Sequence, residues 1–477
     1  MATTTQETTR LGPQAGYRSL NQEVALDALE VQGDLPRWLS GSLLRNGPAL
    51  YEDRERSVQH WFDGQAMLHR FTLADGRVSY ANRFLQTKSY EAMRAGKLAL
   101  SEFATDPCRS IFKRLMTVFD PQVTDNTAVT LTELGDRHYA MTEGPISVQF
   151  DPKTLETLGY SERYPGTFAT AHPHRDPDTG ALINVATRMG PRNSYRFFVH
   201  APRQRPRGLA SKGVNQPGYI HSFAMSERYI ALTEFPFTVR SIEIPLSGRP
   251  FIENFRWHPE RGTRILVFDR HSGKKVGTYE TEAGFAFHHV GAWDEDGRLV
   301  VEYCDHGSPA IIDAFYLGRL RQARTGDFRP EPRLRRVIVD LDARTTTTEY
   351  RSQHVIEMPR INEQACYLRP YRYVYGVGTT ADNIYDTADR LVKVDNESGD
   401  AADWYEPAAY VGEPIFVPAP GRTAEDDGVL LSVVVDAPGE RSYLLALDAR
   451  SMNEIARAYA PRVIPFGFHG RFYPEVV

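Results

Sequence analysis

The chain has 477 residues, with 56 basic and 61 acidic side chains and a formal net charge of −5. This length is ample for a well-buried core and is compatible with one large β domain or with several smaller domains. The balanced charge, without a basic stripe or a long charged run, argues against nucleic acid as a partner.

The cysteines and the N-terminal segment bear on the compartment. Cys108, Cys304 and Cys366 are the three cysteines, and they show no repeated spacing. So few unpatterned cysteines argue against a disulfide framework and indicate a reducing environment. The first 20 residues lack the apolar core of a signal peptide. No apolar run approaches the roughly 20 residues that span a bilayer. We therefore expect a cytoplasmic protein, at most attached to a membrane surface.

Short strand-like runs dominate the chain after an N-terminal tail. Residues 1–18, Thr-rich and then Gly12-Pro13, are expected to be disordered, and residues 19–477 to form a single domain. Turn sequences such as Ala74-Asp75-Gly76 and Asp294-Glu-Asp-Gly297 separate the runs, which favours an antiparallel all-β protein. The clearest runs cover residues 77–82, 146–150, 195–200, 229–234, 264–268, 299–303, 336–340, 371–377, 391–394, 429–435 and 443–447.

So many short strands predict a β-propeller, because radial repetition of small sheets leaves only short, protected edges. The sequence has no strict repeat of about 40 to 50 residues, so periodicity does not set the number of blades. No linker interrupts the strands, which favours one domain.

Two segments have helical patterns. Over residues 106–119, apolar residues recur at helical spacing beside basic ones, which fits a short helix lying in a bilayer interface. Packing against the protein's own core is the alternative for this pattern. The expected membrane-facing residues are Ile111, Phe112, Leu115, Met116 and Phe119. A second helix is predicted to have Ser308 as its N-cap and Pro309 as its first helical residue, and to run to about Arg324 across the top of the barrel.

Four of the 14 histidines have a distinctive setting. His172, His221, His288 and His469 lie beside strand-like runs, among aromatic, small or proline residues. This setting predicts one metal held at a common axis by several strands. The wide spacing of the four histidines and the lack of Cys-x-x-Cys or His-Glu-x-x-His argue against a structural zinc site built from local motifs. Imidazole suits zinc, copper, iron and nickel. A tetrahedral zinc would be closed, whereas a larger coordination sphere leaves positions for O₂ at Fe(II). The alternative for each histidine is an ordinary hydrogen-bonded imidazole.

Neutral imidazole ligands need an acceptor on the other ring nitrogen, and this acceptor is typically a carboxylate. Glu143, Glu357 and Glu413 are lone carboxylates among apolar or small residues. Burial of such a carboxylate is costly without a donor, so these three are the expected partners of the imidazoles. An exposed glutamate at a strand edge is the alternative for each of them.

Motifs along nearly the whole chain, from about Leu20 to His469, resemble the carotenoid cleavage oxygenases, a family of non-haem iron enzymes. The resemblance implies a seven-bladed β-propeller with Fe(II) on its axis and a helical or loop cap that forms a substrate tunnel. It implies His172, His221, His288 and His469 as the iron ligands, held by Glu143, Glu357 and Glu413. The matching segments are Leu44-Arg-Asn-Gly-Pro48, His60-Trp-Phe-Asp-Gly64, Thr170-Ala-His-Pro-His174, His221-Ser-Phe223, Phe287-His-His289, Glu413-Pro-Ile-Phe-Val417 and Phe468-His-Gly470.

Three segments resemble the animal branch, which contains β-carotene oxygenases and the retinoid isomerohydrolase. They are residues 60–64, 84–86 and 106–112. In that branch the last segment belongs to a membrane-facing patch at the tunnel mouth, so the resemblance favours peripheral membrane attachment. It also implies a lipophilic carotenoid as the substrate, while a monomer and a homodimer both remain open.

The expected reaction is cleavage of a conjugated C=C bond by O₂ to give aldehydes, with 15,15′-cleavage of β-carotene to retinal as the first candidate. No acid or base side chain is required, and an apolar tunnel positions the bond. Val129 is a candidate for the wall of an open coordination position. The alternatives are eccentric cleavage of an apocarotenoid, isomerisation with ester cleavage, cleavage of a stilbene or phenylpropenoid, and a propeller binding module with structural histidines.

Overall fold

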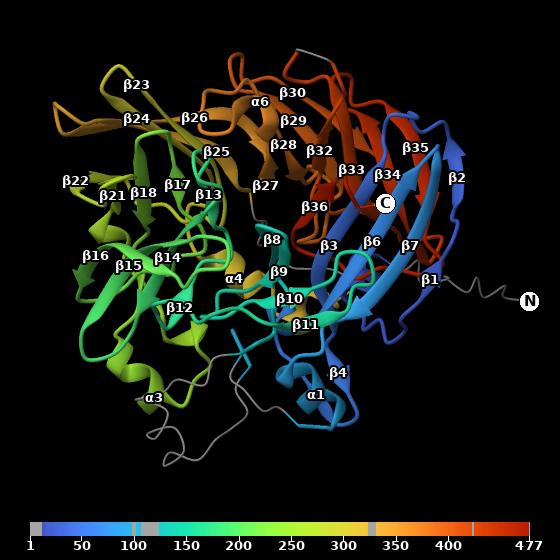
Figure 1. The fold of residues 1–477 in the computed structure, drawn as a ribbon, viewed down its shortest axis with the longest axis horizontal. Coiled ribbons are helices and arrows are strands. Elements are labelled where there is room, and N and C mark those ends of the chain that lie inside the picture. The colour runs from blue at the N-terminus through green and yellow to red at the C-terminus, as the bar shows by residue number, and fades with distance from the viewer. Residues whose placement is uncertain (1–11, 98–101, 106–123, 323–330, 422–423, 477) are drawn as a thin grey trace, which may run out of the picture.

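The computed structural model describes residues 12–97, 102–105, 124–322, 331–421 and 424–476. Within these residues, seven antiparallel sheets of four or more strands stand around a common axis (Figure 1). The predicted all-β fold and the seven-bladed β-propeller are therefore confirmed. Each strand run predicted from the sequence overlaps a strand of this propeller.

We number the blades in chain order from the first complete sheet. Blade 1 contains β8 (Thr130–Leu134), β9 (Arg137–Met141), β10 (Val148–Phe150) and β11 (Thr157–Tyr160). Blade 2 contains β12 (Phe168–Ala169), β13 (His174–Arg175), β14 (Leu182–Arg188), β15 (Asn193–His200) and β16 (Arg207–Val214). Blade 3 contains β17 (Ala224–Met225), β18 (Tyr229–Glu234), β21 (Thr263–Asp269) and β22 (Lys275–Thr281). Blade 4 contains β23 (His289–Glu295), β24 (Arg298–Asp305), β25 (Arg333–Asp340) and β26 (Thr345–Val355).

The remaining blades use both ends of the chain. Blade 5 contains β27 (Glu357–Arg360), β28 (Tyr373–Gly378), β29 (Arg390–Asp395) and β30 (Ala401–Tyr405). Blade 6 contains β2 (Glu30–Gly33), β31 (Ala409–Val411), β32 (Ile415–Pro418), β33 (Gly428–Asp436), β34 (Arg441–Asp448) and β35 (Glu454–Tyr459). Blade 7 contains β1 (Ala25–Leu26), β3 (Gly41–Leu50), β6 (Gln65–Ala74), β7 (Arg77–Phe84) and β36 (Gly470–Tyr473).

Short elements fill the connections. Two-stranded ribbons are formed by β4 (Glu52–Asp53) with β5 (Arg56–Ser57), and by β19 (Phe237–Thr238) with β20 (Arg256–Trp257). The α-helices are α1 (Lys88–Arg94), α3 (Ile244–Ser247), α4 (Ala310–Ala314), α5 (Leu317–Leu320) and α6 (Glu363–Cys366). The 3₁₀ helices are η1 (Pro13–Tyr17), η2 (Trp61–Asp63), η3 (Ser241–Glu243), η4 (Ile252–Asn254) and η5 (Pro259–Arg261). No helix in the described part of the chain is long and apolar enough to cross a bilayer.

Both ends of the chain close the ring. The C-terminal strand β36 pairs with β3, with Gly470 opposite Arg45, and the N-terminal strand β2 pairs with β35 of blade 6. In Figure 1 the blue strand β2 accordingly lies beside the red strand β35. Because blades 6 and 7 each combine strands from both ends of the chain, backbone hydrogen bonds hold the propeller closed.

Two predicted turns show why the hairpins form where they do. Asp75 and Gly76 connect β6 to β7 with φ of 50° and 74°, and Asp296 and Gly297 connect β23 to β24 with φ of 47° and 78°. Positive φ at both central residues matches the twist of the flanking strands, and Asp-Gly is a favoured pair for it. The core lies between neighbouring blades, and strands such as β3 and β18 are buried along their whole length.

The predicted tail boundary is wrong for residues 12–18. Pro13–Tyr17 form η1, and the Tyr17 ring packs against Trp61 and Phe466 at centroid separations of 5.8 and 4.9 Å. The Tyr17 hydroxyl also bonds Thr387 Oγ1 at 3.0 Å. Burial of this aromatic ring anchors a segment whose composition resembles a disordered tail.

The helix predicted from Ser308 to Arg324 is divided. It appears as α4 and α5, separated where Tyr316 is extended and pairs with His60. Pro309 is the N-cap and not the first helical residue. The predicted membrane-facing helix at 106–119 lies outside the described residues.

We expect Gly47→Ala to destabilise the protein. A Cβ at Gly47 would lie 2.4 Å from Gly467 Cα, so the backbone of one strand would have to move. Such overpacking costs typically about 1–3 kcal/mol, which thermal denaturation would detect as a lower midpoint. Gly208→Ala on β16 is the matched control, since nothing lies within 4 Å of its added Cβ. Equal midpoints for the two variants would contradict this packing account.

Candidate metal centre

Each of the seven blades contributes one of the residues singled out in the sequence. The four histidines come from blades 2, 3, 4 and 7, and the three glutamates come from blades 1, 5 and 6. His172 lies between β12 and β13, His221 precedes β17, and His288 and His469 directly precede β23 and β36. Since these short strands reach the axis, residues far apart in the sequence meet there.

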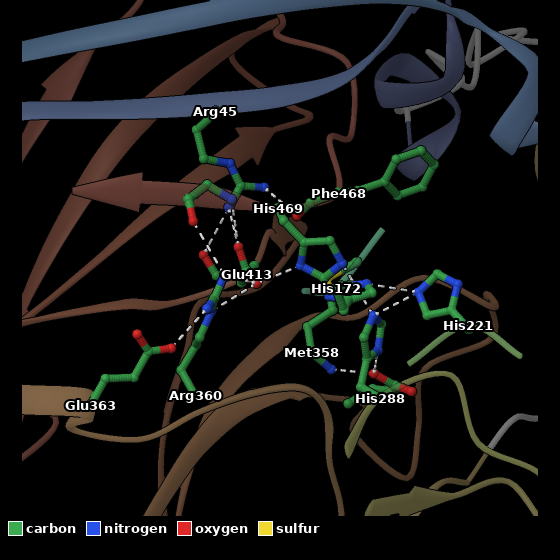
Figure 2. Close-up of polar contacts among 12 residues, drawn as sticks. Arg45, His172, His221, His288, Met358, Arg360, Glu363, Glu413, Phe468 and His469 are labelled. Atoms are coloured by element: carbon green, nitrogen blue, oxygen red, sulfur yellow. Dashed lines mark hydrogen bonds and ion pairs between the residues drawn. The ribbon is translucent and has the colours of Figure 1, made fainter. Parts of the chain in front are cut away.

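The four imidazoles converge (Figure 2). The Nε2 atoms of His172 and His221 are 3.0 Å apart, those of His221 and His288 are 3.3 Å apart, and those of His288 and His469 are 3.1 Å apart. One nitrogen from each ring lies within 4.8 Å of the others. The structure therefore brings together the set that the sequence predicted.

Three of these imidazoles are held from outside by the three glutamates. Nδ1 of His221 bonds Glu143 Oε1 at 2.5 Å, Nδ1 of His288 bonds Glu357 Oε2 at 2.6 Å, and Nδ1 of His469 bonds Glu413 Oε1 at 2.7 Å. A carboxylate accepts, so each of these rings carries its proton on Nδ1. The inward Nε2 atom of each of these three rings then carries a lone pair and no proton.

This arrangement of inward-facing imidazole nitrogens fits a bound cation. Nitrogen lone pairs about 3 Å apart repel one another. A ring whose proton is on Nδ1 has no proton on Nε2 to donate to its neighbour. A divalent metal bound by neutral imidazoles removes this repulsion, and imidazole suits zinc, copper, iron and nickel. Carboxylates on the outer nitrogens are the usual arrangement that orients such ligands.

Burial favours the charge states that metal binding requires. Burial and the neighbouring imidazoles lower the pKa of His172 well below its ordinary value. Burial also lowers the pKa of His469 to about 4, against the raising effect of Glu413. Burial alone would raise the pKa of Glu357 and Glu413, but adjacent histidines and, for Glu413, Arg360 hold both pKa values well below their usual range. His172 and His469 are thus neutral, and Glu357 and Glu413 are ionised, near neutral pH.

Each glutamate accepts a hydrogen bond from at least one further side chain. Glu413 lies between Arg45 and Arg360, at 3.3 and 3.0 Å (Figure 2). Glu143 accepts the hydroxyl of Tyr219 at 2.6 Å, and Glu357 accepts Nε2 of His306 at 2.9 Å.

Two of these donors lie in or near segments singled out in the sequence. Arg45 lies in one of the matching motifs, and Tyr219 is two residues from His221. His306 lies between Asp305 and Gly307 in a turn-like context, but its side chain is only 4% exposed. Local sequence context does not report that its ring turns inward.

An apolar cavity of about 630 Å³ reaches the metal centre. Its wall includes His221, His288 and His469, and Val129 lies on the same wall, where its backbone carbonyl accepts the His469 N–H at 3.2 Å. The volume lies in the range of small-molecule sites. Aromatic side chains dominate the lining near the centre: Trp61, Phe62, Phe103, Phe287, Phe315 and Phe468.

The mouth of the cavity is apolar at η3 and α3. Ile242 is 71% exposed and Leu246 is 63% exposed, yet both line the cavity. Arg249 also lines it. Large exposed apolar residues at a cavity entrance mark a surface suited to an apolar partner.

Comparison with known proteins gives consistent matches along nearly the whole chain. A model of the retinal pigment epithelial membrane protein family matches residues 17–474. Carotenoid isomerooxygenase of Galleria mellonella is 34% identical over 497 residues, covering 96% of each chain. Human beta,beta-carotene 15,15'-dioxygenase is 31% identical over 515 residues, covering 94% of this chain and 92% of that one.

Solved structures agree. Cobalt-substituted apocarotenoid oxygenase of Synechocystis has a TM-score of 0.86 and 28% identity, covering 97% of this chain and 99% of that chain. A likeness of this extent includes every blade of the propeller. From the family model, the relatives and the shared propeller together, the chain belongs to the carotenoid oxygenase family.

Proposed function

We propose that this protein is an Fe(II)-dependent dioxygenase that cleaves a conjugated C=C bond of a carotenoid or apocarotenoid with O₂ and releases two aldehydes. The first candidate is 15,15′-cleavage of β-carotene to retinal. The observation that carries the proposal is the set of four converging imidazoles, three of them oriented by glutamates, in the wall of an apolar cavity. The names of the relatives support the dioxygenase class.

His172, His221, His288 and His469 would hold the iron, and Glu143, Glu357 and Glu413 would orient three of them. Bound iron supplies the capacity to bind and activate O₂, and four neutral ligands leave its full positive charge in place. Val129 would close one side of the centre, because it lies on the cavity wall next to His469.

The chain's own side chains would position the polyene substrate and exclude water from the site. Trp61 and the phenylalanines of the lining give an apolar surface against which a polyene can lie. Glu143 and Glu357 also touch the cavity, but their oxygens are engaged by Tyr219 and by histidines. No acid–base step is assigned to them, and the choice of bond then depends on how far the polyene enters.

The same lining supports peripheral attachment to a membrane as part of this proposal. Ile242 and Leu246 project at the mouth through which a lipid-soluble substrate would enter. Apolar side chains inserted into the acyl boundary, with a cation such as Arg249 at headgroup level, are the usual form of interfacial docking.

Product analysis tests the reaction. We expect the iron-loaded protein to convert β-carotene under ¹⁸O₂ into labelled aldehydes, with retinal as the chromatographic product of central cleavage. Longer apocarotenals would instead assign eccentric cleavage, and cis-retinol would assign isomerisation. The His288→Ala variant should form no product, because it removes a ligand and leaves Glu357 without its partner. Absence of aldehyde from β-carotene and from apocarotenals would refute the dioxygenase proposal.

Acid should destabilise the metal-free protein through its buried histidines. The folded-state pKa of His469 is about 4 and its unfolded value is near 6.5, so its stabilising contribution is full above pH 6.5 and is lost as pH falls towards 4. The loss is on the order of 3 kcal/mol for this histidine. Thermal midpoints measured from pH 7 to pH 4.5 should fall less steeply for His469→Gln than for wild type.

His258→Gln is the control for that experiment, since His258 is a surface residue. Its pH profile should match that of wild type. A wild-type slope in His469→Gln would show that this imidazole is not buried in neutral form.

Membrane docking is tested by vesicle sedimentation. Leu246→Asp and Ile242→Asp should reduce co-sedimentation with phosphatidylcholine vesicles containing some phosphatidylserine, because each places a charge in the acyl boundary. Leu158→Asp on β11 alters another exposed leucine and should bind as wild type does. Equal binding by all the variants would place the docking surface elsewhere.

A further inference from the structure

The carboxylate of Glu357 is gripped on both of its oxygens. Oε2 accepts Nδ1 of His288 at 2.6 Å and the backbone N–H of Met358. Oε1 accepts Nε2 of His306 at 2.9 Å. Glu357 therefore connects a proposed metal ligand to a histidine that is not one of the four converging imidazoles.

His306 is held rigidly at this place. It follows the last residue of β24, Asp305, and its backbone N–H bonds the carbonyl of Phe285 at 2.7 Å. Asp305 accepts the N–H groups of Phe285 and Gly307 and the guanidinium of Arg335, at 3.0, 2.9 and 3.0 Å. A loop fixed on both sides of its turn in this way presents the His306 ring in one orientation.

The hydrogen bonds also define the chemical state of the His306 ring. Glu357 is an acceptor, so Nε2 carries the proton and donates. Nδ1 of His306 is buried and has no partner among the described residues, and the ring lies beside Phe285 and Phe287 at centroid separations of 6.4 and 5.7 Å. His306 therefore meets Glu357 through Nε2, and its other ring nitrogen faces the apolar side of this site.

The three glutamates differ in this respect. Glu413 is paired with two arginines, Glu143 accepts a tyrosine hydroxyl, and Glu357 accepts an imidazole N–H. His306 is the side chain that bonds Oε1 of Glu357, while His288 and the Met358 N–H bond Oε2. The two oxygens of Glu357 are thus held from two directions.

We propose that His306 is a positioning residue that sets the orientation of Glu357 and, through it, aims Nε2 of His288 at the metal. The terminal torsion of a glutamate is soft, so a donor on the second oxygen restricts a rotation that the first oxygen's partners leave partly free. Groups that orient a ligand in this way typically change metal affinity about 10- to 100-fold when they are removed. This inference rests on the metal centre of the proposed function.

The test uses variants of the full chain loaded anaerobically with Fe(II) or Co(II). His306→Phe keeps a ring of similar size and removes the donor, whereas His306→Gln offers an N–H near the position of Nε2. Release of the metal to an excess of chelator gives the dissociation rate, and the visible spectrum of the Co(II) form reports the ligand geometry. His200→Gln on β15 is the matched control, since His200 is a buried histidine outside the cavity lining.

We expect His306→Phe to release the metal about 10- to 100-fold faster and to shift the Co(II) spectrum. His306→Gln should stay within a few fold of wild type, and His200→Gln should match it. His306→Leu replaces the Phe variant if that one does not fold.

Two results would overturn the proposal. One is a wild-type release rate and spectrum in a folded His306→Phe or His306→Leu. The other is equal impairment in the Phe and Gln variants, which would assign His306 a packing role. Failure of the wild-type protein to bind Fe(II) or Co(II) would instead refute the proposed function. Failure of the His306 proposal and failure of the proposed function therefore give different results.

Discussion

Everything at the axis depends on four imidazole nitrogens pointing at one another. Such a cluster is repulsive in isolation, and two features make it tenable. Carboxylates on the outer nitrogens hold three of the rings in one tautomer. A cation bound at the centre would supply the charge to which all four respond. The seven-bladed ring delivers this geometry because each inner strand ends at the same small region of space.

Burial of the three glutamate carboxylates is unfavourable, and a different set of donors compensates for it in each blade. A buried carboxylate is costly without hydrogen-bond donors. Glu413 receives them from Arg45, Arg360 and the Gly470 N–H. Glu143 is served by a tyrosine and Glu357 by a histidine. The centre is therefore asymmetric in charge although it is nearly regular in the placement of its rings, and this asymmetry distinguishes His469 electrostatically from His221 and His288.

The cavity and the metal centre are built from the same segments. Phe287 precedes His288, and Phe468 precedes His469, so a residue of the apolar wall adjoins a residue of the centre. One short segment before each of β23 and β36 thus serves both purposes. The outer rim is separate, since Ile242 and Leu246 belong to η3 and α3.

Local patterns in the sequence were enough for the strands and for the seven residues of the centre. Alternating apolar runs bounded by Asp-Gly turns identify hairpins such as β6–β7, because the turn's φ values demand those residues. The sequence settings of the four histidines and three glutamates, together with the family motifs, predict these seven residues as one site. These signals are short-range, and the propeller preserves them.

Tertiary structure decided what depends on contacts between distant segments. Tyr17 is ordered because Trp61 and Phe466 bury it, and the helix after Ser308 divides because Tyr316 pairs with His60. The pairing of each glutamate with its histidine joins blades 1 and 3, 5 and 4, and 6 and 7, which no spacing encodes. His306 shows the same limit, since its neighbours in sequence are polar and its role follows from Glu357, 51 positions away. Composition and periodicity describe which face of an element is buried, whereas the partner that meets it is chosen only when the ring closes.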